Sequence, residues 1–454
     1  MRNKDITIIK GDGIGPEVID ATLRIMDAVK TPLNWDIQVA GKEAFKQGIE
    51  TGVPKNTITS IEKNKIVLKG PLETPVGHGE SSANVTLRKL FETYANLRPA
   101  HHIPSIQTPF SDRDIDLIVV RENLEDLYAG IEHQQTPDVA QSLKLMSRTG
   151  CERICRFAFE YARALDRKKI HCTTKANIMK LTEGLLKKVF EEISSDYPNI
   201  QAEHIIVDNC AHQLVINPEQ FDMIIASNMN GDILSDLTSG LVGGLGIAAS
   251  ANIGDDYAIF EAVHGSAPTI AGQNKANPTA LISASILMLR HLELYRHASQ
   301  IEAALYKTLE DQNLTIDLAK DPKMAVSCSD FTDYVIRNIS DNITDTHHYK
   351  PLTLPPSPIA TKTPTHTPPT GIDVFIQSSE PLSTIVEKIQ TCIDTNKDTL
   401  LTICNRGAQV YPETRPLKTL VDHWQCKFKT DDTLGLLQRI TPHFNWVHCE
   451  KLWQ

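Results

Sequence analysis

The strongest constraint on the fold is a regular alternation of short, β-branched apolar runs with longer segments of helical periodicity. The apolar runs include ITIIK at 6–10, KIVLKG at 65–70 and IDLIVVR at 115–121, while the segment at 151–165 repeats its apolar residues with helical spacing. This alternation predicts α/β layers built on a largely parallel sheet. A chain of 454 residues has room for roughly two to four domains, each with its own core.

A change of composition marks a boundary toward the C-terminal end. Residues 341–370 are dense in Pro and Thr and contain few large apolar side chains, which predicts an extended, solvated linker. Beyond it, apolar runs at 371–377 and 399–404, with a helical stretch near 382–393, predict a small separate α+β domain. Three of the four tryptophans lie there, and we expect most tryptophans to be buried in a core.

Charge and cysteine content argue against several classes of protein. With 46 Lys and Arg against 56 Asp and Glu, the formal net charge is -10, and no dense basic run suits nucleic acid or an anionic membrane surface. No apolar run reaches the ~20 residues of a membrane-spanning helix, and the N-terminal residues lack the pattern of a signal peptide. The nine cysteines are scattered without a C-x-x-C pair. We therefore expect a protein of the reducing cytoplasm.

Several arginines and small polar residues predict an anion site. Ser82 and Asn84 stand near a predicted helix start, where hydroxyl, amide and backbone N–H groups can bind a carboxylate. Arg88 and Arg98 follow along the chain, and Arg121 is the last residue of the apolar run at 115–121. Three guanidinium groups suit a di- or tricarboxylate. From the residues alone, the alternative of solvated surface arginines with a plain helix cap stays open.

Three aspartates predict a site for a divalent cation. Asp208 follows the run HIIV and is expected to end a strand, while Asp232 and Asp236 are four residues apart and would share one face of a helix. Hard oxygen ligands indicate Mg²⁺ or Mn²⁺. The alternative is a helix cap with a solvated surface group. Lys175, just after a predicted strand at 170–174, is a candidate general acid/base, although a lone lysine is more often a solvated surface group.

Glycine-rich loops predict close approach of the backbone to a ligand. The turn GDGIGPE at 11–17 lacks the G-x-G-x-x-G spacing of a dinucleotide fingerprint. Two stretches rich in small residues follow at 243–254 and 258–278, and the second contains a Gly-Ser-Ala-Pro turn after His264. Long loops rich in small residues tend to be functional in compact domains. The turn after His264 lets the backbone approach a phosphate or a purine of a ligand.

In their order along the chain, these motifs resemble the isocitrate/isopropylmalate dehydrogenase family of metal-dependent β-decarboxylating dehydrogenases. The resemblance covers about residues 5–340 and includes GDGIGPE, SSANVTLR, VVRENLEDLYAGIEH, TKANIMK, NMNGDILSDL and EAVHGSAP. It implies two discontinuous α/β domains around a cleft, with an open mixed sheet that is not a Rossmann fold. The implied parts are a large domain at 1–93 and 243–338, a small domain at 94–242 with a dimer clasp at about 126–147, a linker at 339–370 and an accessory domain at 371–454.

The resemblance also implies a role for each candidate residue. The catalytic residues are Tyr128, Lys175 and Asp208, of which Lys175 and Asp208 enter the cleft from the partner subunit of a homodimer. The substrate is assigned to Ser82, Asn84, Arg88, Arg98 and Arg121, and the metal, Mg²⁺ or Mn²⁺, to Asp208, Asp232 and Asp236. The nicotinamide coenzyme is assigned to Thr74, His264, Gly265, Ser266, Ala267, Thr269, Ile270 and Asn277.

Within the family, Ser82 and Asn84 resemble the isocitrate type, because isopropylmalate enzymes carry apolar side chains there. The implied reaction is the oxidative decarboxylation of isocitrate to 2-oxoglutarate and CO₂. One alternative is a dehydrogenase for homoisocitrate or another 2-hydroxy diacid. The other is a non-catalytic regulatory subunit.

The coenzyme implied by the resemblance is NAD or NADP. NADP users of the family typically carry Lys-Tyr where this chain has Thr269 and Ile270, and Tyr and Arg where it has Ile316 and Lys320, so NAD is favoured. The tail resembles the extra C-terminal domain of longer isocitrate dehydrogenases from some bacteria, Thermus among them. We expect it to act in regulation, or in oligomer contacts that join homodimers into a larger assembly.

Overall fold

The computed structural model describes residues 3–73, 82–341, 368–412 and 417–453. The chain divides into two compact units. The first comprises Met1–Ala129 and Lys144–Ile359, and the second comprises Gly130–Leu143 and Ala360–Gln454. The division of the first unit into a large and a small domain stays a prediction, and most of the predicted linker lies outside the described residues.

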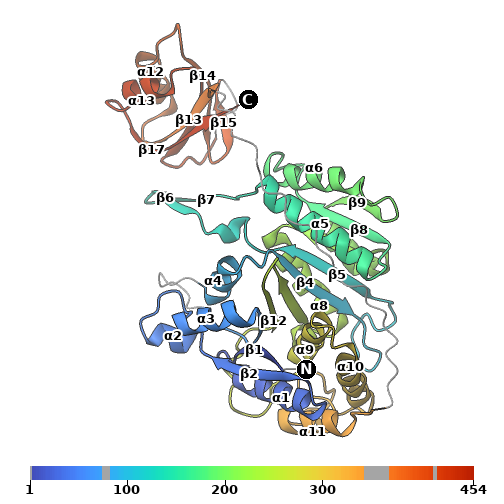
Figure 1. Ribbon diagram of the computed structural model, residues 1–454. Coiled ribbons are helices and arrows are strands. Elements are labelled where there is room, and N and C mark those ends of the chain that lie inside the picture. Colours follow the sequence, from blue (N-terminus) through green and yellow to red (C-terminus); the bar gives the residue numbers. More distant parts are fainter. Residues whose placement is uncertain (1–2, 74–81, 342–367, 413–416, 454) are drawn as a thin grey trace. The chain divides into compact units, whose positions relative to one another are not determined.

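A ten-stranded mixed sheet forms the centre of the first unit, in the order β2-β1-β3-β12-β11-β4-β5-β10-β8-β9 (Figure 1). Neighbouring strands are parallel except where β11 pairs with β12 and β4, and where β4 pairs with β5. The open mixed sheet confirms the predicted fold class. Its strands are β1 (Lys4–Ile9), β2 (Leu33–Gln38), β3 (Ile66–Lys69), β4 (Ala95–His101), β5 (Asp116–Glu122), β8 (Lys169–Thr174), β9 (Gln201–Ile206), β10 (Met223–Ala226), β11 (Ala249–Ile253) and β12 (Ala258–Ala262).

Helices pack on both faces of this sheet. In α5, for example, buried Cys151, Ile154, Cys155 and Ala158 lie at positions i, i+3, i+4 and i+7 and share one face of the helix. Ser147 Oγ caps its first turn by accepting from the N–H of Gly150 at 2.9 Å. The helices of this unit are α1 (Gly15–Ala28), α2 (Lys42–Lys46), α3 (Lys55–Asn64), α4 (Ala83–Leu90), α5 (Arg148–Ala164), α6 (Thr182–Ser194), α7 (Val207–Ile216), α8 (Asn228–Val242), α9 (Thr279–His291), α10 (Tyr295–Glu310) and α11 (Cys328–Arg337).

The central strands present different chemistry on their two faces. Because side chains alternate along a strand, Asn96 and Arg98 of β4 point to the face that α8 covers, where Arg98 contacts Ser235 and Asp236. Leu97 and Pro99 point to the opposite face, which α5, α9 and α10 line. The same strand therefore serves a polar face and an apolar one.

The second unit is built on a five-stranded antiparallel sheet in the order β15-β14-β16-β13-β17. Trp424 is buried in its core at 2% exposure, whereas Trp446 and Trp453 are 38% and 56% exposed, against our expectation for most tryptophans. The α+β class of this domain is as predicted. Its elements are β13 (Gly371–Gln377), α12 (Leu382–Cys392), β14 (Thr399–Asn405), β15 (Ala408–Tyr411), β16 (His423–Lys429), α13 (Thr433–Ile440) and β17 (Asn445–Leu452).

A hairpin from the middle of the chain belongs to the second unit. Its strands are β6 (Glu132–Thr136) and β7 (Val139–Ser142), inside the range predicted for the dimer clasp. Thr136 Oγ1 donates a hydrogen bond to Asp422 Oδ1 at 2.7 Å. The hairpin is thus tied to the C-terminal domain.

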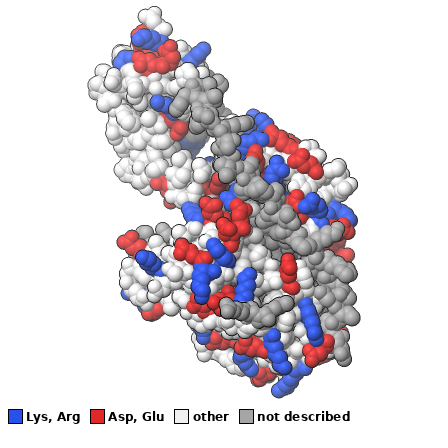
Figure 2. Space-filling model, viewed as in Figure 1, with Lys and Arg blue, Asp and Glu red and all other residues white. Residues whose placement is uncertain are grey.

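Lys and Arg are interspersed with Asp and Glu on the face of the molecule shown in Figure 2. All nine cysteines lie among the described residues, and each is a free thiol. Among the same residues, no helix combines the length and apolar character needed to cross a membrane. The cytoplasmic location stays a prediction.

Candidate active site

Three predicted substrate arginines come together from three elements. Arg88 lies on α4, Arg98 in the middle of β4 and Arg121 near the end of β5, and their side chains are 12%, 8% and 1% exposed. Burial, followed by the charges of Arg98 and Arg88, lowers the pKa of Arg121 to about 10. The three guanidinium groups are therefore close enough to repel one another. Such a concentration of positive charge favours a multiply charged anion.

Two predicted metal ligands face these arginines from α8. Arg98 Nη1 lies 3.2 Å from Oδ1 of both Asp232 and Asp236, and Arg121 also bonds to Asp232. Although burial alone would raise the pKa of Asp232, the charges of Arg121 and Arg98 lower it. The pKa of Asp236 is raised by burial and by the negative charge of Asp232, against the influence of Arg98.

Tyr128 completes this cluster from the short 3₁₀ helix η1 (Leu127–Ala129). Its Oη donates a hydrogen bond to Asp232 Oδ2 at 2.5 Å, and the Arg121 guanidinium carbon lies 4.9 Å from its ring centroid. Burial and the hydrogen bond to Asp232 raise the pKa of Tyr128. The phenol therefore keeps its proton at neutral pH, as a proton donor must.

Lys175 and Asp208 pair with each other instead. The prediction that Asp208 ends a strand is wrong, because β9 ends at Ile206. Asp208 lies in the first turn of α7, where the helix dipole favours an acidic residue. Its side chain is 67% exposed, and its bond to Lys175 lowers its pKa. Within the described part of the chain, no group of three Asp, Glu, His or Cys side chains is placed to hold a metal ion. The structure therefore does not bring Asp208 together with Asp232 and Asp236 within one chain.

The two small polar residues of the predicted substrate site lie at the start of α4. Ser82 is its N-cap residue. Asn84 Nδ2 donates to the Leu72 carbonyl at 3.4 Å, while its buried Oδ1 has no hydrogen-bond partner among the described residues. An unpartnered buried acceptor next to Arg88's helix turn suits a ligand that brings a donor.

The predicted coenzyme loop is fastened to the first glycine turn. The N–H of Ile14 donates to the Ser266 carbonyl at 2.9 Å, and a Cβ on Gly13, whose φ is +59°, would lie 1.9 Å from that oxygen. Glycine is needed at position 13 for both reasons. In the same loop, His264 Nε2 is buried without a partner among the described residues, which suits a coenzyme group.

The remaining coenzyme residues follow along this loop. Asn277 Nδ2 donates to Asp317 Oδ2 at 2.9 Å. Ile270 packs against the main core, while Thr269 and Gly265 are exposed. Ala267 has a φ of +39°, so the backbone turns sharply between Ser266 and Thr269. Thr74 lies outside the described residues.

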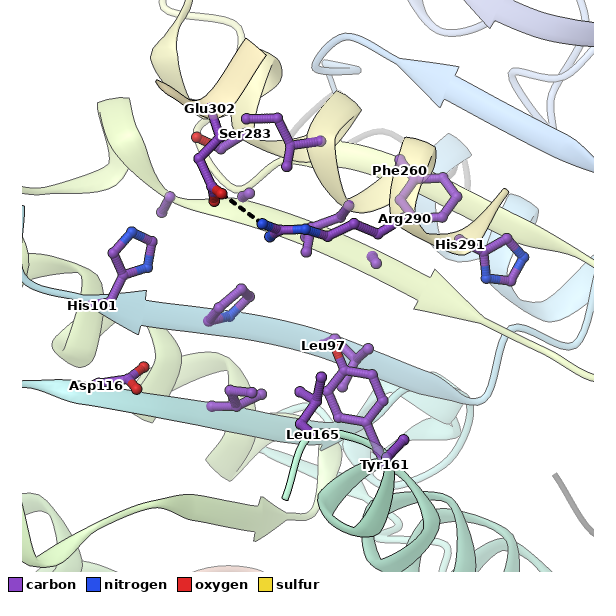
Figure 3. A pocket seen from close by; sticks show the side chains of 18 of the residues that line it. Leu97, His101, Asp116, Tyr161, Leu165, Phe260, Ser283, Arg290, His291 and Glu302 are labelled. Atoms are coloured by element: carbon purple, nitrogen blue, oxygen red, sulfur yellow. Dashed lines mark hydrogen bonds and ion pairs between the residues drawn. The ribbon is translucent and has the colours of Figure 1, made fainter. Parts of the chain in front are cut away.

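A cavity of about 1190 Å³ lies on the opposite face of the sheet (Figure 3). Leu97, His101, Tyr161 and Phe260 line it, and its Arg290 is already paired with Glu302 at 2.6 Å. It contains none of the predicted site residues, because Leu97 and Arg98 point to opposite faces of β4. The candidate active site is therefore identified by the chemistry of its residues, and not by the size of a cavity.

The sequence as a whole matches two families of known proteins. Residues 5–335 match the isocitrate/isopropylmalate dehydrogenase family, and residues 369–454 match the C-terminal domain of bacterial isocitrate dehydrogenases. The chain belongs to the isocitrate/isopropylmalate dehydrogenase family.

Individual members of this family are similar over most of the chain. A Thermus thermophilus protein named NADP isocitrate dehydrogenase is 52% identical and aligns with 99% of this chain and 93% of its own. A Dictyostelium discoideum protein named as a regulatory subunit of mitochondrial NAD isocitrate dehydrogenase is 47% identical over 74% of this chain and 92% of its own. A solved structure of a Thermus thermophilus protein superposes with a TM-score of 0.94 at 52% identity, covering 98% of this chain and 93% of that one.

Sequence reasoning missed the groups beneath the arginines. Buried Lys69 and Arg88 both pair with Glu261 of β12, and burial lowers the pKa of Lys69. The only signal was a charged residue at the end of each of two apolar runs, KIVLK and AIFE. Asn96 and Asn252, also buried, carried no signal at all.

Proposed function

We propose that this chain catalyses the oxidative decarboxylation of isocitrate to 2-oxoglutarate and CO₂, with hydride transfer to a nicotinamide coenzyme. The observation that carries the proposal is the arginine trio facing Asp232 and Asp236. A tricarboxylate needs concentrated positive charge, and a chelated 2-hydroxy acid needs hard oxygen ligands for a divalent ion beside it. Family membership and the Thermus relative's name support the same substrate.

In this proposal, the substrate carboxylates bind to Arg88, Arg98 and Arg121, with Ser82 and Asn84 at the start of α4. The guanidinium groups of Arg98 and Arg121 are held by buried contacts on one side, including Asn228 with Arg121. Their orientation is therefore set before the substrate arrives. Preorganised charge of this kind costs little reorganisation on binding.

The metal proposed is Mg²⁺ or Mn²⁺, held by Asp232 and Asp236 of one chain and Asp208 of a second. The residues fit such an ion, because Asp232 and Asp236 are carboxylates one turn apart on α8 and the side chain of Asp236 is still 53% exposed. When bound, the ion would act as a Lewis acid on the C2 oxygen of the substrate.

The protein's own groups handle the protons. As the C2 hydrogen leaves as hydride for the coenzyme, a base in the paired Lys175 and Asp208 of the second chain accepts the proton of the C2 hydroxyl. The bond to the β-carboxyl group then breaks, releasing CO₂ and leaving an enolate. Tyr128 gives its proton to the enolate carbon, which yields 2-oxoglutarate.

We propose a homodimer in which Lys175 and Asp208 serve the site of the second copy. In their own chain they pair with each other and not with the cluster on α8. Large apolar side chains near them are exposed, among them Ile216 of α7 at 57%, Ile233 of α8 at 59% and Leu181 at 89%. Exposed apolar residues on two packed helices suit a partner surface.

The finer proposal for the coenzyme is a preference for NAD. Thr269 and Ile270 are uncharged where the family's NADP users carry Lys-Tyr, and the nearby Lys275 and Lys320 are exposed. A 2′-phosphate would therefore lose charge-assisted hydrogen bonds worth about 1.5–3 kcal/mol each. The Thermus and Rickettsia bellii relatives, in contrast, are named for NADP. A higher kcat/KM with NADP than with NAD would contradict the proposed preference.

A second candidate function is a non-catalytic regulatory subunit, which the name of the Dictyostelium relative favours. Purified protein assayed with isocitrate, Mg²⁺ and each coenzyme decides between the two. We expect turnover, and no turnover with either coenzyme supports the regulatory subunit. A higher kcat/KM for homoisocitrate than for isocitrate would assign homoisocitrate as the substrate.

The substrate site itself is tested by Arg98→Leu. We expect this change to raise the KM for isocitrate about 10²-fold or more, because a charge-assisted contact is lost and Asp232 and Asp236 stay unneutralised. Arg290→Leu is a matched control, since Arg290 is also a largely buried arginine paired with a carboxylate, at 17% exposure, but lines the cavity on the opposite face. An unchanged KM for Arg98→Leu would contradict the proposed site.

A further inference from the structure

Two fully buried asparagines lie beneath the substrate arginines, on the polar face of the sheet. Asn96 of β4 and Asn252 of β11 are directly opposite each other in an antiparallel pair, and both are 0% exposed. Neither takes part in the proposed chemistry. A buried amide is costly unless each of its donors and acceptors is paired, so their presence here calls for a reason.

Their hydrogen bonds form a continuous path between two arginines. Arg98 Nε donates to Asn96 Oδ1 at 2.9 Å, and Asn96 Nδ2 donates to Asn252 Oδ1 at 2.8 Å. Asn252 Nδ2 donates to Glu261 Oε1 at 2.7 Å, and the same oxygen lies 3.2 Å from Arg88 Nη2. The path therefore runs from Arg98 on β4 to Arg88 on α4.

The orientation of the Asn252 amide is fixed by its neighbours. The charges of Lys69 and Arg88 lower the pKa of Glu261 against the effect of burial, so this carboxylate is ionised and only accepts. On its other side, Asn252 Oδ1 accepts from both Asn96 and Asn123, the latter at 2.9 Å. Position 252 thus requires a donor toward β12 and an acceptor toward β4, which an amide of this length provides.

We propose that Asn252 is a positioning residue that holds Arg88 and Arg98 at the separation that the substrate carboxylates require. The proposal rests on the proposed function, in which both arginines bind the substrate. Like charges repel, and the two guanidinium groups come from different elements, so a rigid link between them preserves the geometry of the empty site. Preorganisation of this kind strengthens binding by removing the cost of ordering.

The test compares Asn252→Ala with Asn64→Ala. Asn64 of α3 is also buried and donates to Thr7 Oγ1 at 3.0 Å and Asp36 Oδ2 at 3.1 Å, in a polar cluster of β1, β2 and α3. Both changes delete a buried amide, and both should lower the Tm. We expect only Asn252→Ala to raise the KM for isocitrate, by about 10- to 100-fold, with a much smaller change in kcat.

A milder change provides a second test that does not require Asn252→Ala to fold. Asn252→Ser keeps a polar side chain, but its single hydroxyl is too short to bond to both Asn96 and Glu261, so the path to Arg88 is broken. We expect it to raise the KM for isocitrate about tenfold, with a much smaller change in kcat.

Two results would overturn the proposal: a KM within about twofold of the wild type for Asn252→Ala, or the same result for Asn252→Ser. The first must be read beside Arg98→Leu. If Arg98→Leu raises the KM and Asn252→Ala does not, the positioning role alone fails. If neither changes it, the proposed substrate site fails.

Discussion

At the scale of single residues, every arginine of the candidate site already has a carboxylate partner. Arg98 and Arg121 contact Asp232, and Arg88 contacts Glu261. A divalent ion on Asp232 and Asp236 would take over the negative charge that now faces Arg98 and Arg121. The two guanidinium groups could then turn their charge to the substrate, so the cation and the tricarboxylate should favour each other's binding.

Tyr128→Phe removes the proposed proton donor without changing the ring that lies against Arg121. We expect kcat to fall about 10²- to 10⁴-fold, because general acid catalysis contributes that much, while the KM for isocitrate changes little. Steady-state kinetics measure both. Tyr306→Phe is a suitable control, since Tyr306 bonds to His101 in the cavity on the other face. A full kcat in Tyr128→Phe would remove Tyr128 from the mechanism.

Glu122 gives a prediction about stability and pH. It is 4% exposed, and burial raises its pKa from 4.5 to about 7, although the N–H groups of Leu124 and Glu125 donate to its carboxylate. Between these two pH values the folded chain binds more protons than the unfolded chain. The free energy of unfolding should therefore fall as the pH rises, by roughly 3 kcal/mol in total from this group.

Glu122→Gln stays neutral, so we expect it to lose that part of the pH dependence. Denaturant unfolding at pH 5 and pH 8 measures the effect. The free energy of unfolding of the variant, minus that of the wild type, should be larger at pH 8 than at pH 5. Parallel pH profiles for the two proteins would show that Glu122 is not the responsible group.

At the scale of elements, periodicity predicted the strands and helices, and spacing predicted that Asp232 and Asp236 share a face of α8. What the residues alone did not predict is which partners they meet. Arg88, Arg98 and Arg121 converge only because α4, β4 and β5 become neighbours, and such contacts depend on the strand order. The hydrogen-bond network through Asn252 could not be predicted for a further reason. A polar residue inside an apolar run only weakens the pattern that predicts a strand, and does not indicate a partner.

Helix α8 also carries the prediction for the partner surface. Ile233 is 59% exposed, with Met229 of the same helix at 41%. We expect Ile233→Asp to convert the dimer into a monomer and to abolish turnover, because a charge would be buried without a partner. Light scattering gives the mass. Met324→Asp, at a residue 74% exposed outside α7 and α8, should stay dimeric, and a dimeric Ile233→Asp would refute this surface.

At the scale of the whole molecule, the chain joins the region that matches the dehydrogenase family, residues 5–335, to a C-terminal accessory domain. The hydrogen bond between Thr136 and Asp422 ties that domain to the hairpin within the predicted clasp. Sequence could suggest a separate domain from the Pro/Thr-rich boundary, but it could not pair it with a hairpin more than 200 residues earlier. A role in oligomer contacts or regulation stays a prediction for this domain.

The central claim is that each active site combines Asp232 and Asp236 of one chain with Lys175 and Asp208 of another. The most direct measurement mixes two inactive variants, Lys175→Met and Asp236→Asn, after dissociation and reassociation. Half of the dimers should then be mixed, and each mixed dimer contains one intact site, so about a quarter of the wild-type activity should return. Activity no higher than that of the separate variants, with mixed dimers demonstrated, would contradict the shared site.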